Sequence, residues 1–229
     1  MTRLFVHVEG ETEETFVNEV IAPHLHGLGF HSVTAKLLGN ARNRSNRGGI
    51  RSWPVVRDDI VDHLKGDPGC FSTTLVDYYA LPAGGANGWP NRDAAPLQPI
   101  DERARVVEIG MEVIVNGHFA HTANPVRFVG GVLFHEFEAL LFSDCQAFAD
   151  GIGAPQVAAP LQNIRDGFQC PEHINDNPNT CPSRRISGVV NGYQKIIHGN
   201  VGALHIGLQA VRMECPHFDA WLTRVENLQ

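Results

Sequence analysis

Blocks of apolar residues alternate with helix-patterned segments along the first two thirds of the chain. Four of the apolar blocks are short and rich in β-branched or aromatic residues, and they predict strands. They span Leu4–Val8, Phe30–Leu38, Phe71–Val76 and Val126–Phe134. The segments between them place apolar residues near a spacing of 3.6, which predicts helices. These helices span about Thr12–Leu28, Pro54–Leu64 and Asp101–Asn116, the first with Thr12 as its N-cap.

Strands that alternate with helices predict an α/β fold with a parallel sheet and right-handed crossovers. Beyond Ser143 the pattern is helical and loop-rich, with no further strong strand. We therefore expect an α/β core over residues 1–145 and a helical C-terminal region over residues 146–229 that packs on this core.

The composition is typical of a soluble globular protein, with 43% hydrophobic and 19% charged residues. No apolar run approaches the ~18 residues of a membrane span, and no signal peptide is visible. The five cysteines are odd in number and scattered, which argues against a disulfide framework. We expect a reduced, cytoplasmic protein with no membrane association, and a homo-oligomer is compatible with this expectation.

The charge is distributed unevenly. The formal net charge is −7, yet one segment between Lys36 and Arg57 holds only basic residues among its charged positions. Its arginines include four that we expect to hold phosphate groups of a polyanion. They are Arg42, Arg44, Arg47 and Arg51. The alternative is a solvated surface loop, which is the usual setting of a charge run.

Acidic residues follow three of the predicted strands. Glu9 follows the first and Asp77 the third, and Glu136 and Glu138 follow the fourth. The carboxyl ends of parallel strands meet at one edge of the sheet, where ligands bind. Carboxylates, water and phosphate oxygens make up Mg²⁺ sites, and such a metal can activate water beside a phosphodiester. The four acids therefore predict a Mg²⁺ (or Mn²⁺) site; the alternative is that they cap helices or pair with arginines.

A second phosphate site is predicted at Ser183, Arg184 and Arg185. These residues follow a loop rich in proline and asparagine, and Ser183 is a suitable N-cap for a helix. A helix N-terminus flanked by two arginines favours phosphate binding. The alternative is a capped helix whose arginines pair with surface acids.

The segment from Val8 to Glu13 resembles the first motif of the Toprim fold, which topoisomerases, primases and overcoming-lysogenisation-defect (OLD) nucleases share. Several segments together resemble a bacterial Toprim-like family of unknown function (domain of unknown function 4276), related to OLD-type Toprim nucleases. They are Glu9–Phe16, Thr73–Tyr79 with Leu81-Pro82, His135–Asp144, Pro182–Ile186, and Cys215–Phe218 with Trp221. The resemblance implies a Toprim-like Rossmannoid sheet, with Glu9 in acid/base chemistry or metal binding and an Asp-x-Asp metal pair after a later strand.

The chain departs from this pattern at the Asp-x-Asp position, which reads Asp77-Tyr78-Tyr79. Either Glu136 or Glu138 supplies the second acid, or one metal binds, or the site is inactive; we expect the replacement. The resemblance then implies a metal-dependent nuclease of DNA or RNA, with catalytic Glu9 and Asp77. It also implies an AAA or ABC-type ATPase as partner, in a phage-defence system of which this chain is the effector.

A non-catalytic sensor or regulatory subunit, bound to that ATPase, is the alternative that the missing aspartate supports. The chain has no Walker-type segment and no Gly-x-Gly-x-x-Gly turn after a strand. Any ATP dependence must therefore come from the partner, and phosphoryl transfer on a small nucleotide is a weaker third hypothesis.

Overall fold

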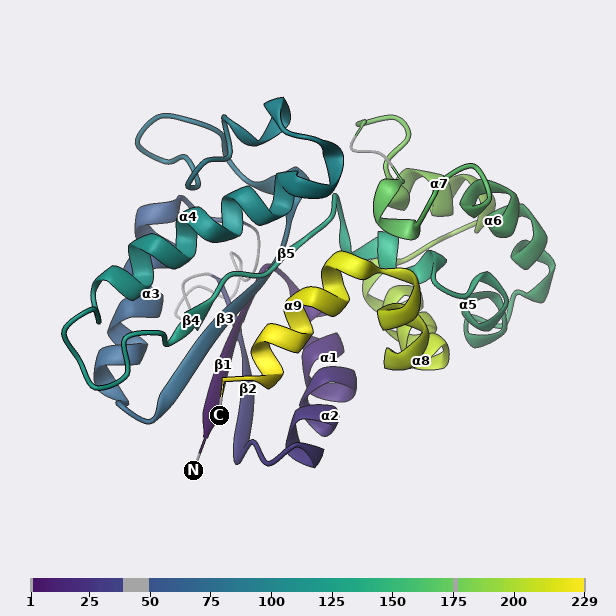
Figure 1. The fold of residues 1–229 in the computed structure, drawn as a ribbon. Helices are drawn as coiled ribbons and strands as arrows, with labels where there is room; N and C mark the ends of the chain where they lie inside the picture. The colour runs from purple at the N-terminus through teal and green to yellow at the C-terminus, as the bar shows by residue number, and fades with distance from the viewer. Residues whose placement is uncertain (1, 39–49, 175–176, 229) are drawn as a thin grey trace.

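A parallel β-sheet lies at the centre of the computed structural model, which describes residues 2–38, 50–174 and 177–228 (Figure 1). The strand order is β2-β1-β3-β4, and β5 pairs with β3 beyond the end of β4. Every pairing is parallel. The predicted α/β fold with a parallel sheet is therefore confirmed.

The strands agree closely with the hydrophobic pattern. They are β1 (Arg3–Val8), β2 (Ser32–Leu37), β3 (Cys70–Asp77), β4 (Phe128–Val129) and β5 (Val132–Leu133). In the register of the sheet, Val8 lies opposite both Leu37 and Leu75. Asp77 is the last residue of β3 and lies opposite Leu133. The sheet thus ends at one edge with Glu9 directly after β1 and Asp77 at the tip of β3.

The predicted fourth strand is wrong as a single element, because Gly130 and Gly131 divide it into β4 and β5. A Cβ atom on Gly131 would lie 2.2 Å from the carbonyl oxygen of Thr74 and 2.2 Å from Nε1 of Trp221, so only glycine fits. The Gly131 N–H donates to the hydroxyl of Thr74 at 3.0 Å, and this side chain replaces a ladder bond at the interruption.

The first helix is continuous but begins earlier than predicted. It comprises α1 (Glu11–Phe16), a π-helical turn (Val17–Ile21) and α2 (Ala22–Gly27). Its N-cap is Gly10, so the assignment of Thr12 as N-cap is wrong: Thr12 lies inside the first turn. The widened π turn ends two residues before Pro23, which has no N–H to give to the carbonyl four residues earlier.

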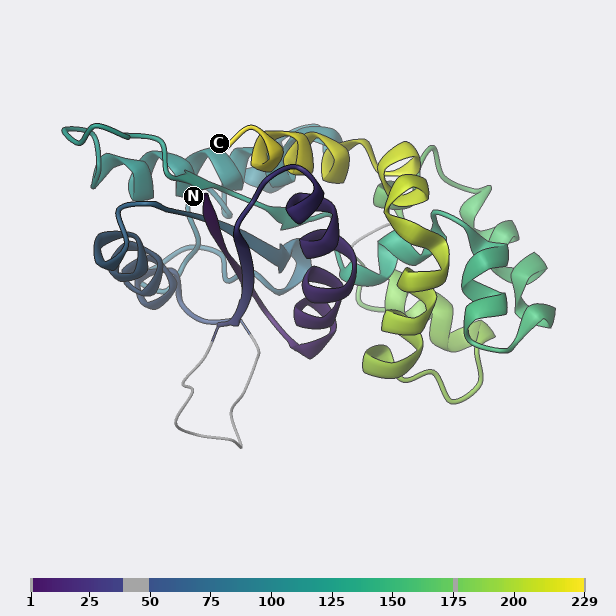
Figure 2. The ribbon, with the colours of Figure 1, turned by 90° about the horizontal axis from the view of Figure 1, so that it is seen from below.

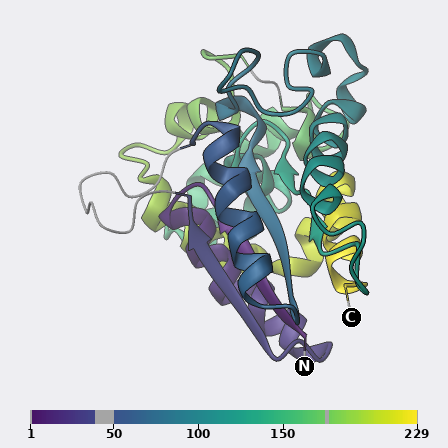
Figure 3. The ribbon, with the colours of Figure 1, turned by 90° about the vertical axis from the view of Figure 1, so that its left-hand side faces the viewer.

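Helices cover both faces of the sheet. On one face, α3 (Trp53–Gly66) and α4 (Arg103–Gly117) lie in front of the strands in Figure 3, and their apolar side chains form a core with Val76 and Val132. On the other face, Leu4 and Val6 of β1 belong to a larger core that includes α1, α2 and the C-terminal helices.

The C-terminal part contains five α-helices and no strand among its described residues. The helices are α5 (Cys145–Gly151), α6 (Ala158–Arg165), α7 (Pro182–Val189), α8 (Asn200–Glu214) and α9 (Pro216–Glu226). Figures 1 and 2 show α5 to α8 gathered at one side of the sheet, with α9 returning across it. Short helical turns also lie between the main helices and strands from β3 onwards. They are Tyr78–Ala80, Ala95–Leu97, Ile100–Glu102, Phe137–Phe142, Pro155–Val157, Pro171–His173 and the π-helical Lys195–Gly199.

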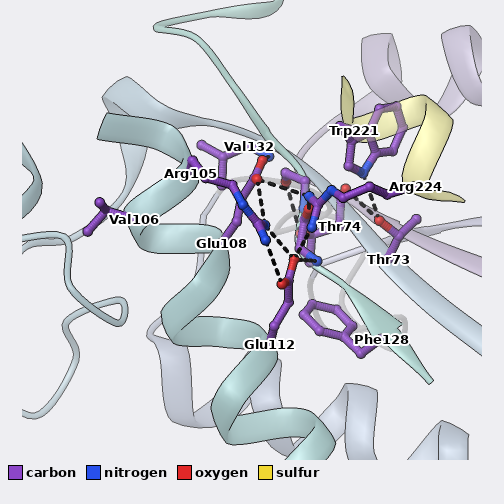
Figure 4. Close-up of polar contacts among 12 residues, drawn as sticks. Thr73, Thr74, Arg105, Val106, Glu108, Glu112, Phe128, Val132, Trp221 and Arg224 are labelled. Carbon is purple, nitrogen blue, oxygen red and sulfur yellow. Dashed lines mark hydrogen bonds and ion pairs between the residues drawn. The ribbon is translucent and has the colours of Figure 1, made fainter. Parts of the chain in front are cut away.

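A buried carboxylate ties α4, β5 and α9 together (Figure 4). Glu108 is 0% exposed and accepts four hydrogen bonds. Its Oε1 accepts from the Val132 N–H at 3.0 Å and from His217 Nε2 at 2.9 Å. Its Oε2 accepts from Arg224 at 3.0 Å and from Arg105 at 3.3 Å.

No helix within the described residues is both long and apolar enough to cross a membrane.

Candidate functional site

Four carboxylates converge at the carboxyl edge of the sheet, around one ammonium group. We call these residues the acidic edge: Glu9, Glu13, Asp77 and Glu138, with Lys195 between them. Glu9 follows β1, Asp77 ends β3, and Glu138 lies in the helical turn Phe137–Phe142 that follows β5. The structure therefore brings together the strand-end acids of all three positions that the sequence indicated.

Lys195 is the residue that sequence reasoning missed. It begins the π-helical turn Lys195–Gly199 before α8, far along the chain from the sheet. Its Nζ lies 3.3 Å from Oδ2 of Asp77, 3.2 Å from Oε2 of Glu138 and 3.4 Å from Oε1 of Glu13. The local sequence around Lys195 carries no motif, so no signal in the chain marks it.

Glu13 was also missed as a member of the site. Its Oε2 accepts a hydrogen bond from the N–H of Gly10 at 3.0 Å, and its Oε1 faces Lys195. A glutamate three residues after an N-cap commonly folds back onto the cap. That spacing was the available signal, because it directs the Glu13 side chain to the helix start, and hence to the end of β1.

The two acids after β5 have different surroundings. Glu138 is buried and contacts the same ammonium as Asp77, whereas Oε2 of Glu136 accepts the N–H of Ser183 at 3.0 Å. Asp77 is fixed by a second contact, since its Oδ1 accepts the N–H of Phe137 at 2.9 Å. Of the two glutamates, it is therefore Glu138 that shares the Lys195 ammonium with Asp77.

A strained turn at His135 sets up this arrangement. His135 has φ +62°, and the N–H of Glu136 donates to the carbonyl oxygen of Phe134 at 2.9 Å. This is a γ-turn with a non-glycine residue in the left-handed region, which costs about 1–3 kcal/mol. Such strain is concentrated at functional sites. Here it reverses the chain after β5 and directs Glu136 and Glu138 back to the sheet edge.

Three of these acids, Glu9, Asp77 and Glu138, hold their protons more tightly than usual. Burial, reinforced by the neighbouring Glu13, raises the pKa of Glu9 from 4.5 to about 7. Burial likewise raises the pKa of Asp77 well above its ordinary value and raises that of Glu138, although Lys195 opposes both shifts. Burial lowers the pKa of Lys195, but Asp77, Glu138 and Glu13 outweigh it and raise that pKa, so the ammonium stays charged.

The residues present suit a hard divalent cation. Oε2 of Glu9 is buried and has no hydrogen-bond partner, and one lysine faces carboxylates that outnumber it. Carboxylate oxygens are the ligands of Mg²⁺ and Mn²⁺. Within the described part of the chain, no three of these acids place oxygens all within 4.8 Å of one another. In this structure the acids thus surround Lys195 rather than forming a preformed cage.

The metal-free protein is expected to lose stability as the pH rises from 4.5 towards about 7. In this window the folded state keeps a proton on Glu9 that the unfolded state has released, so rising pH favours unfolding. Urea unfolding across this range, in the presence of a chelator, measures the effect. In Glu9→Gln, where this proton is absent, stability should fall less steeply; equal slopes in both proteins would contradict the assignment.

The predicted phosphate-binding residues are not brought to the acidic edge as a group. Arg42, Arg44 and Arg47 lie outside the described residues. Arg51 precedes α3 and lines a pocket with three aspartates of that helix, so its immediate surroundings are acidic.

The Ser183 helix start differs from the prediction. The N-cap of α7 is Cys181, and Ser183 lies inside the first turn, so the assignment of Ser183 as N-cap is wrong. Its backbone N–H instead binds the carboxylate of Glu136. Arg184 is exposed, whereas Arg185 donates from Nε to the Thr180 carbonyl at 2.7 Å and lies over the ring of Phe168. The helix start thus binds a carboxylate of this chain.

Comparison with known protein families places the chain in context. A family model described as "Domain of unknown function (DUF4276)" matches residues 8–226. No curated protein and no solved structure matches this chain. The matched region includes every residue of the acidic edge.

Proposed function

The chain belongs to the DUF4276 family, and from its acidic edge we propose that it is a metal-dependent nuclease that hydrolyses phosphodiester bonds in DNA or RNA. One observation supports this most: carboxylates from three strand ends, those of Asp77 and Glu138 buried, meet around a single ammonium, and the buried Oε2 of Glu9 is left without a partner. Buried acids of this kind, with raised pKa values, are concentrated at catalytic sites.

Three carboxylates would hold the cation: Glu9, Asp77 and Glu138. When bound, Mg²⁺ or Mn²⁺ supplies neutralisation of phosphate charge and activation of water. The position of Glu138, beside Asp77 at Lys195, makes it our choice for the second acid that Tyr79 does not provide. Glu136 is engaged by the N–H of Ser183 and would orient the turn that carries Glu138.

The chain's own groups supply acid–base and electrostatic chemistry. Glu9 would act either as a ligand of the cation or, where Asp77 and Glu138 alone hold it, as general base. A carboxyl with a pKa near 7 exchanges protons readily at neutral pH, which suits the second role. Lys195 is a fixed positive charge at the same place, suited to stabilising the negative charge that develops on a phosphate during cleavage. Arg42, Arg44, Arg47, Arg51, Arg184 and Arg185 are retained as proposed contacts to the nucleic-acid backbone.

A relationship to Toprim nucleases of the OLD type is part of this proposal. It rests on the resemblance of the Glu9 and Asp77 segments, and is supported by the parallel sheet that carries both acids at one edge. On the same resemblance we propose an AAA or ABC-type ATPase as partner and a role in phage defence.

A regulatory subunit without catalysis is the second candidate. The contacts of Lys195 favour it, because three of the four carboxylates already have a cationic partner within the chain. In that case the ion pairs join the C-terminal region to the sheet, and the acids bind no metal.

The test begins with Mn²⁺ titration by calorimetry of the wild type, of Glu9→Gln/Asp77→Asn, and of the exposed control Glu11→Gln. Cleavage of plasmid DNA and of single-stranded RNA is then measured with Mg²⁺ or Mn²⁺. We expect the double variant to lose Mn²⁺ binding and to cleave at least about 100-fold more slowly, while the control behaves as wild type. Absence of both Mn²⁺ binding and cleavage of either substrate would favour the regulatory subunit, and cleavage unchanged in the double variant would overturn the proposed site.

A further inference from the structure

A second group of metal-ligating types of side chain lies between β1 and α3, on the face of the sheet that α3 covers. His7 of β1 is 0% exposed, and neither of its ring nitrogens has a hydrogen-bond partner. Buried polar groups without partners are costly and rare. A fully buried imidazole of this kind therefore indicates that its nitrogen binds a group that the protein itself does not supply.

Helix α3 places two further side chains that can ligate a metal ion beside His7. Asp59 and His63 are four residues apart on this helix, so they share one of its faces. His7 Nδ1 lies 3.9 Å from Oδ2 of Asp59, and His63 Nδ1 lies 3.9 Å from Oδ1 of the same residue. The two imidazole ring centroids are 5.5 Å apart.

These three residues converge more closely than any other such set in the described part of the chain. Their ligand atoms all lie within 4.8 Å of one another, and no other described group of three or more His, Cys, Asp and Glu does so. Two imidazoles and one carboxylate are a donor set of Zn²⁺ and related transition metals, with a fourth position left for water. Mg²⁺ prefers oxygen ligands alone.

We propose that His7, Asp59 and His63 bind a transition-metal ion of the Zn²⁺ class, which fastens α3 to the central strand of the sheet. This site is separate from the acidic edge in donor chemistry and in position, since His7 faces α3. It does not depend on nuclease activity.

The surroundings provide a route for the ion. The Asp59 side chain is 44% exposed and lines a pocket of about 430 Å³ together with Asp58 and Asp62. An acid-lined opening raises the local concentration of cations. The ion can therefore reach Asp59 from solvent before it meets the buried imidazole.

Lys36 competes with the ion for these groups. Its Nζ lies 3.8 Å from Oδ1 of Asp59 and contacts the ring of His63. The Lys36 side chain is 35% exposed and comes from β2 at the sheet edge, so it can turn into solvent when an ion binds. Because its charge repels a dication, removal of Lys36 should strengthen binding.

The experiment titrates the metal-stripped full chain with Co²⁺, a spectroscopic substitute for Zn²⁺, and follows its visible absorption before displacement by Zn²⁺. We expect one ion per chain with a tetrahedral spectrum, a loss of about 100-fold in affinity in His63→Ala and in Asp59→Asn, and a gain of about fivefold in Lys36→Met. The exposed His26→Ala is the matched control. His63 and Asp59 are partly exposed, so these variants should fold, which circular dichroism verifies.

Two results would overturn the proposal. One is the absence of a Co²⁺ spectrum in both the wild type and Lys36→Met. The other is wild-type affinity in His63→Ala. The variant Glu9→Gln/Asp77→Asn should keep the Co²⁺ site, so failure of the acidic edge as a metal site is distinguishable from failure of this one.

Discussion

Lys195→Met should cleave nucleic acid about 1000-fold more slowly than the wild type, the loss expected when one preorganised charge is removed from a catalytic site. Lys195 is the cation that faces Asp77 and Glu138, with its Nζ 3.3 and 3.2 Å from their oxygens. Methionine keeps the length and the apolar stem of the side chain and removes the charge. Initial rates on whichever substrate the wild type cleaves, at saturating Mn²⁺, measure the effect.

Metal affinity separates this catalytic role from a structural one. With the lysine charge gone, a dication meets less repulsion at the same carboxylates, so Mn²⁺ should bind Lys195→Met at least as tightly as the wild type. Lys65→Met, on an exposed position of α3, is the control and should change neither quantity. If Lys195→Met retained wild-type cleavage, Lys195 would not act on the phosphate. If it lost both cleavage and Mn²⁺ binding while still folded, the lysine would instead organise the carboxylates.

Glu108→Ala should reduce the free energy of unfolding by about 4 kcal/mol, the range found when one partner of a buried ion pair is removed. The Glu108 carboxylate is fully buried and accepts hydrogen bonds from Val132, His217, Arg224 and Arg105. Alanine leaves the Val132 N–H and the His217 ring without this acceptor. Urea unfolding near neutral pH, compared with the exposed Glu102→Ala, measures the loss; the control should change stability by less than about 0.5 kcal/mol.

The loss in Glu108→Ala should also depend on pH. Burial lowers the pKa of His217, but Glu108 outweighs it and raises that pKa above 6.5. A raised histidine pKa adds stability that is fully present below 6.5 and disappears as the pH rises through the folded value. The difference between wild type and Glu108→Ala should therefore be larger at low pH than at high pH. A difference that grew with pH would contradict a charged His217–Glu108 pair.

The sequence alone determined the sheet and the edge at which the acids meet. The apolar blocks located β1 and β3 almost to the residue, because strands with both faces covered are largely apolar along their length. They located the partly exposed edge strand β2 to within two residues. Parallel strands then bring Glu9 and Asp77 to one edge whatever the details of packing. The division of the fourth strand was not predicted, because it depends on Trp221 and Thr74 filling the space beside Gly131.

Only the tertiary structure decided which side chains complete the acidic edge. Lys195 is 118 residues from Asp77 along the chain, and its approach depends on how the C-terminal helices pack against the sheet. The turn at His135 decided that Glu138 faces Lys195 while Glu136 binds the N–H of Ser183. Periodicity specifies elements and their faces, because it reflects local backbone geometry. Contacts between distant segments depend on packing, which no local spacing encodes.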